Sequence, residues 1–104
     1  MASKAVVEVR IESKDPSVVQ SLESSLKAVS VEKEAPHRDL LTIMKVISES
    51  VSMISALIGL WKQWKSLQSP PPVKIEAKSG AQLDLSTVKS EGDIRDFVTK
   101  NAGG

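Results

Sequence analysis

The chain lacks cysteine and tyrosine, and its 104 residues include only one phenylalanine and one histidine. The absence of cysteine excludes disulfide bonds, thiolate nucleophiles and zinc–thiolate sites, and it fits a reducing, cytoplasmic setting. An excess of charge of one sign is also missing, because 14 basic and 13 acidic residues give a net charge of +1. A nucleic-acid-binding surface needs more positive charge and more aromatic rings than this, so we expect no nucleic-acid partner.

Residues that carry chemistry are equally scarce. The single histidine, His37, follows a proline and has only Asp39 close by, whereas a metal site needs several ligands at matched spacing. No serine stands in a nucleophile elbow or a phosphate-binding loop. We therefore interpret His37 as an exposed loop residue, and we expect no catalytic, cofactor-binding or metal-binding residue and no enzyme activity.

The first third of the chain predicts a strand, a helix and a second strand. Residues 5–13 alternate between apolar and charged positions, with Val7, Val9 and Ile11 on one side. Asp15-Pro16 is a strong helix start, which predicts a helix near 16–28. A short strand follows at 30–35, with Val31 pointing inward, and Pro36 ends it.

The middle of the chain shows apolar residues at helical spacing from Leu40 to Leu67. One row contains Leu40, Met44, Ile47, Val51, Ile54, Ile58 and Trp61, and a second row beside it contains Met53, Leu57, Leu60, Trp64 and Leu67. This pattern predicts one long apolar helix over about 38–67, roughly 40 Å long at about 1.5 Å per residue. Since a compact domain of this size has a radius of gyration near 13 Å, we expect the helix to be longer than the body of the protein.

The last third predicts a hairpin and a closing helix. Pro70-Pro71-Pro72 ends the long helix, residues 73–78 alternate as a strand, Ser79-Gly80 marks a turn, and Leu83 and Leu85 lie on the returning strand. Ser90 begins a short helix that is docked by Ile94, Phe97 and Val98. The last residues, 101–104, are expected to fray; Gly103-Gly104 resembles the tail of ubiquitin-like modifiers, but the element order does not open with a hairpin.

The order β-α-β-α-β-β-α predicts a single α+β domain over 1–104, with a four-stranded sheet covered by helices. No hydrophobic secretion signal follows the first residues. The excess apolar surface of the long helix leaves three interpretations. It is a core helix crossing the sheet, an interfacial helix on a membrane surface, or an interaction helix that binds a protein or a second copy.

The membrane interpretation is limited by charge. Lys45 and Glu49 interrupt the apolar run, so the segment is too short to span a bilayer, although Trp61, Lys62, Trp64 and Lys65 are typical of an interfacial anchor. The interaction interpretation is the one we favour, because half of the helix exceeds the reach of a short sheet. The expected interaction residues are Val51, Ile54, Ile58, Trp61, Trp64 and Leu67.

The order of these segments resembles a known family. The chain is similar to the effector-associated constant component domain of bacterial conflict systems in its opening run Val6 to Glu12, the Asp15-Pro16 helix start, the Glu34-Ala35-Pro36 entry to the apolar segment, the Leu60-Trp61-Lys62-Gln63-Trp64 end, the hairpin 73–85 and the acidic closing helix around Asp93-Ile94. The apolar segment carries serines and Gly59 where the family often has a glycine-rich patch, and it ends in lysines where the family often has arginines.

The resemblance implies a non-catalytic adaptor or oligomerisation component of an antiviral defence system. Its partners would be a protein effector or a signalling NTPase, within a homo- or hetero-oligomer. Two alternatives stay open: a small protein that acts on a membrane surface, and an accessory subunit of an unrelated complex.

Overall fold

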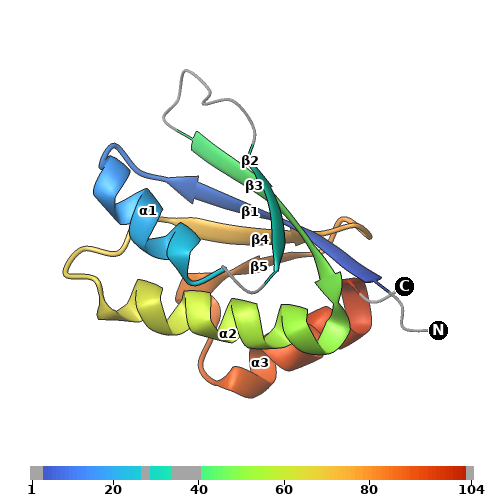
Figure 1. Cartoon of the computed structure of the whole chain (residues 1–104). Coiled ribbons are helices and arrows are strands. Elements are labelled where there is room, and N and C mark those ends of the chain that lie inside the picture. The colour runs from blue at the N-terminus through green and yellow to red at the C-terminus, as the bar shows by residue number, and fades with distance from the viewer. Residues whose placement is uncertain (1–3, 27–28, 34–40, 103–104) are drawn as a thin grey trace.

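The computed structural model describes residues 4–26, 29–33 and 41–102, which form an antiparallel five-stranded sheet with three α-helices packed on one face (Figure 1). The strand order is β2-β3-β1-β4-β5. The elements are β1 (Lys4–Glu12), α1 (Pro16–Ser24), β2 (Ser30–Lys33), β3 (Leu41–Glu49), α2 (Ser50–Ser66), β4 (Val73–Ala77), β5 (Gln82–Asp84), a 3-10 turn (Leu85–Thr87), α3 (Glu91–Phe97) and a π-helical turn (Val98–Ala102).

Strand β1 lies at the centre of the sheet, between β3 and β4. Its apolar and charged residues alternate, so that Ala5, Val7, Val9 and Ile11 are buried while the residues between them face away from the helices. Val9 is opposite Met44 on one side and Ile75 on the other, and both of these side chains are fully buried. The strand predicted over 5–13 is confirmed.

The long helix predicted over 38–67 is wrong. Residues 41–49 form strand β3, the helix starts only at Ser50, and the sheet therefore has five strands rather than four. Met44 and Ile47 fit the predicted helical row, but Ile43 and Val46 lie off it, and the β-branched residues at positions 42, 43, 46 and 47 favour a strand. Strand β3 pairs with β1 along all nine of its residues and with β2 over residues 44–47, which satisfies most of its backbone groups.

Helix α2 is shorter than the protein body. Its 17 residues span about 25 Å, whereas the described structure extends over 39 × 29 × 24 Å. The side of the helix that packs on the sheet is formed by residues at steps of three and four: Met53, Ala56, Leu57, Leu60 and Trp61. The helix therefore lies within the domain and does not extend beyond it.

Helices α1 and α3 lie on opposite flanks of α2. Gln63 of α2 donates a 2.7 Å hydrogen bond to the hydroxyl of Ser21 in α1, and Gly59 faces the end of the same helix, where an added Cβ would lie 3.8 Å from the Ser25 carbonyl oxygen. On the other flank, the ammonium group of Lys62 lies 3.0 Å from the carboxylate of Glu91 at the start of α3.

The shorter elements largely follow the sequence pattern. The helix predicted near 16–28 ends at Ser24, the strand predicted over 30–35 is described up to Lys33, and the hairpin forms with β4 and β5. The buried Leu85 starts a 3-10 turn instead of continuing the strand. Residues 101 and 102 belong to the π-helical turn, and fraying of the tail 101–104 stays a prediction. His37, Pro36 and Gly103-Gly104 lie outside the described residues.

Two aspartates cap helical turns. Asp15 precedes α1 and accepts 2.9 Å and 2.7 Å hydrogen bonds from the backbone and hydroxyl of Ser17, and these bonds lower the pKa of its carboxyl group. Asp84 accepts the same two bonds from the backbone N–H and the hydroxyl of Ser86, at 3.0 Å and 2.8 Å. These bonds lower the pKa of the Asp84 carboxyl group, and the backbone bond has the larger effect. Ser90 is the residue that precedes α3, as predicted, and Asp93 in the first turn accepts a 2.8 Å hydrogen bond from the backbone N–H of Lys89.

The β4–β5 turn depends on one glycine. Gly80 has a φ of 95°, a conformation that side-chain-bearing residues rarely adopt. We expect Gly80→Ala to lower the free energy of unfolding by about 1 kcal/mol, measured by urea denaturation. Gly92→Ala is the matched control, since Gly92 lies in the first turn of α3 without a positive φ; equal losses in both variants would contradict this account of the turn.

Candidate interaction surface

The six residues predicted to form an interaction surface do not lie together. Val51 is 77% exposed, and Ile54 and Ile58 are half-buried on the same flank of α2. Trp61 is only 5% exposed and belongs to the core. Trp64 and Leu67 are half-buried and also pack against the core.

Both tryptophans make contacts inside the domain. The ammonium group of Lys65 lies 3.9 Å from the centre of the Trp61 ring, one helical turn away, which is a cation–π contact. The indole N–H of Trp64 donates a 2.6 Å hydrogen bond to the carbonyl oxygen of Pro71, and this bond ties the proline segment back onto α2. The side chains of Trp61, Trp64 and Lys65 therefore make contacts within the domain.

The α2 ridge, which we define as Val51, Ile54 and Ile58, is what remains of the predicted surface. These residues stand at positions i, i+3 and i+7 of one helix, so they form a continuous stripe. Val51 is the one large hydrophobic side chain that is exposed among the described residues. Lys62 and Lys65 follow the ridge toward the C-terminal end of α2, where both are exposed.

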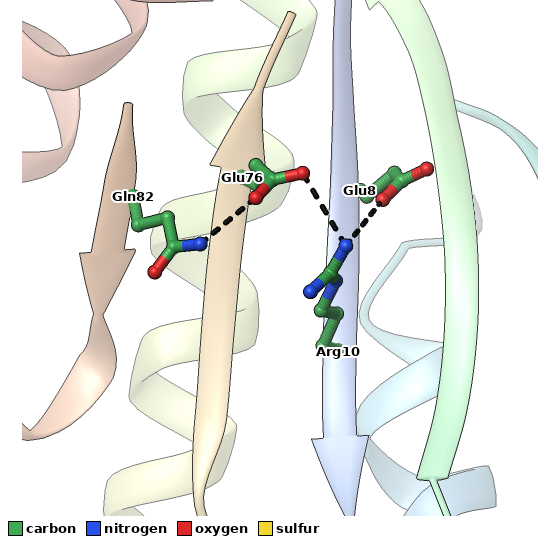
Figure 2. A network of polar contacts seen from close by, with 4 residues as sticks. All are labelled: Glu8, Arg10, Glu76 and Gln82. Carbon is green, nitrogen blue, oxygen red and sulfur yellow. Dashed lines mark hydrogen bonds and ion pairs between the residues drawn. The ribbon is translucent and has the colours of Figure 1, made fainter. Parts of the chain in front are cut away.

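The uncovered face of the sheet carries a polar network that the sequence did not reveal (Figure 2). The guanidinium group of Arg10 lies 3.3 Å from the carboxylates of both Glu8 and Glu76, and Gln82 donates a 2.8 Å hydrogen bond to Glu76. The network joins β1, β4 and β5 across the sheet. The alternation of the strands predicted these residues to face solvent, but the strand order that brings them together was not readable from the sequence.

Neither a metal centre nor a membrane span emerges from the residues that the structure covers. Within 4–26, 29–33 and 41–102, no group of three or more histidine, aspartate or glutamate side chains is placed to hold a metal ion. In the same ranges, no helix is long and apolar enough to cross a bilayer.

The Arg10 network yields a prediction about salt. Glu8 and Glu76 are directly opposite each other in the β1–β4 register, so their charges repel unless Arg10 lies between them. We expect Arg10→Ala to lower the free energy of unfolding by about 1 kcal/mol in low salt and by less in 1 M NaCl. Adding Glu76→Gln to that variant restores part of the loss. A loss that does not depend on salt, measured by urea denaturation, would mean that the network is not electrostatic.

The different exposure of Val51 and Trp61 yields a second prediction, about stability. Trp61→Ala removes a core side chain and is expected to cost about 3–5 kcal/mol of stability. Val51→Ala removes an exposed side chain and is expected to change stability by about 0.5 kcal/mol or less. Thermal and urea unfolding of both variants provide the test, and similar losses in the two variants would contradict the packing of α2 described above.

Comparison of the chain with protein-family models, with curated proteins and with solved structures found no match in any of the three.

Proposed function

We propose that this chain is a non-catalytic protein-interaction module, an adaptor that joins an effector protein or a signalling NTPase in a bacterial defence system. The observation that carries the interaction role is the α2 ridge, because a small domain that exposes aligned apolar residues on a helix presents a surface that a partner can cover. The defence-system context rests on the family resemblance of the sequence.

The ridge suits a helix-in-groove contact. Its three residues repeat at the spacing by which one amphipathic helix fills the hydrophobic groove of another protein. Ile54 and Ile58 already pack partly on the core, so their side chains are held in place before a partner arrives. Such preorganisation reduces the entropy lost on binding.

A membrane surface is the alternative occupant of the ridge. Lys62 and Lys65 are exposed next to it and would favour anionic lipid. Trp61 and Trp64, however, are held in intramolecular contacts, so the aromatic half of an interfacial anchor is not displayed. For this reason we place protein binding first.

The test is a pair of charge substitutions on the ridge. We expect Val51→Glu and Ile58→Glu to abolish co-purification of the partner and to remove any oligomer seen by light scattering, because each buries a charge in an apolar contact. Val51→Glu is the more informative variant, since its side chain is exposed and the substitution leaves the free domain folded.

Ser52→Glu is the matched control. It adds the same charge at an exposed position of the same helix, on a different side from the ridge. A full-length chain that stays monomeric at high concentration and retains no partner would contradict the proposal. Loss of the complex in Ser52→Glu as well would also contradict it. If the chain co-sediments with anionic vesicles and Val51→Glu abolishes this co-sedimentation, the ridge binds lipid instead of a protein.

A further inference from the structure

The core is incompletely covered at the edge where α1 approaches β2. A hollow of about 410 Å³ lies there, lined by Gln20, Glu23, Ser24, Leu26, Val29 and Val31. Leu26 is fully buried, whereas Val29 and Val31 remain half-buried although they pack on the core. An apolar side chain arriving from outside the domain would therefore extend this end of the core.

Strand β2 forms the edge of the sheet beside that hollow. It pairs with β3 on one side, and among the described residues no strand pairs with its other side. An edge strand leaves backbone N–H and C=O groups that can pair with an added strand. The hollow and these groups meet at Val31, which is the residue of β2 that lines the hollow.

The two faces of β2 differ in chemistry. Val31 is opposite the buried Val46, so it lies on the helix-covered face. Glu32 is opposite Lys45 on the uncovered face, and Lys45 is in turn opposite Glu8. From Glu32 through Lys45 to Glu8 the charges alternate in sign, although Glu76 beyond Glu8 is again negative. A basic residue outside Glu32 would continue the alternation at this edge of the sheet.

We propose that the β2 edge binds an extended segment of a partner protein, in which apolar and basic residues alternate. The segment adds a sixth strand to the sheet, places an apolar side chain in the hollow beside α1 and places a lysine or arginine beside Glu32. This surface is separate from the α2 ridge, so the proposal does not depend on the one made above.

A second copy of the chain fits this edge less well. Strand β2 has four residues, and pairing two such strands buries far less than the roughly 1,200 Å² of a stable interface. Glu32 also places a charge on the strand, and charged side chains are one means by which edge strands resist pairing with each other. A single peptide strand with one apolar anchor matches the size of the site better.

The opposite edge of the sheet is a poorer site. Strand β5 has only three residues and turns directly into a 3-10 turn. The hollow beside it is lined by Lys89, Asp93, Asp96 and Lys100 as well as by Leu83, Thr87 and Phe97. Placing an apolar side chain there would remove water from several charged groups.

The probe is an acetylated and amidated pentapeptide of alternating valine and lysine, titrated into the full chain labelled with ¹⁵N. We expect saturable NMR shifts in the backbone amides of residues 29–33 and 20–26, and slower hydrogen exchange in β2. The same peptide with glutamate in place of lysine should bind more weakly. Glu32→Lys should weaken binding of the lysine peptide by roughly fivefold or more.

Glu12→Lys is the matched control, because Glu12 is an exposed glutamate at the end of the central strand and not on an edge. Glu12→Lys should bind the lysine peptide as tightly as the unchanged protein does. Val51→Glu should also bind it equally well, and this result would show that the β2 site is separate from the α2 ridge. Three results would overturn the proposal: no shifts at millimolar peptide, equal binding of the two peptides, or self-association of the chain through β2.

Discussion

The burial of one side of β1 is the constraint on which the rest of the structure depends. Ala5, Val7, Val9 and Ile11 are almost completely excluded from water, and β1 pairs along its length with β3 and along five residues with β4. A strand placed centrally cannot shift by one residue without turning this row toward solvent. The register of both neighbours, and with it the position of α2 over the sheet, follows from that row.

The sequence predicted those elements whose pattern had one explanation. The alternation over 5–13, the Asp15-Pro16 start, the Ser79-Gly80 turn and the docking of Ile94 and Phe97 all have local causes, and the structure has them. The prediction for residues 41–49 was wrong because some of their apolar residues stand at helical spacing, while the same segment is rich in β-branched residues that favour a strand. Tertiary pairing with β1 and β2 decides between the two, and no local pattern contains that information.

The candidate site was predictable only in part for the same reason. Val51, Ile54 and Ile58 keep the predicted helical spacing in α2, and their role in binding stays a prediction. The strand order that sets which side of α2 faces the sheet could not be predicted. Trp61 and Trp64 were therefore assigned to a partner when they belong to the core and to the Pro71 contact. The Arg10 network joins residues far apart in the chain, so no spacing in the sequence reveals it. The hollow beside β2 is lined by residues 20–31, but it depends on how α1 packs beside β2, which their spacing does not show.

The placement of the two tryptophans gives the protein a built-in optical reporter. The chain has no tyrosine, so its near-ultraviolet emission arises from two indoles one turn apart on α2. One indole is enclosed in the core beneath a lysine ammonium group, and the other is hydrogen-bonded to a backbone carbonyl. The tryptophan emission spectrum therefore reports on the packing of α2 against the sheet, and the measurement needs no added label.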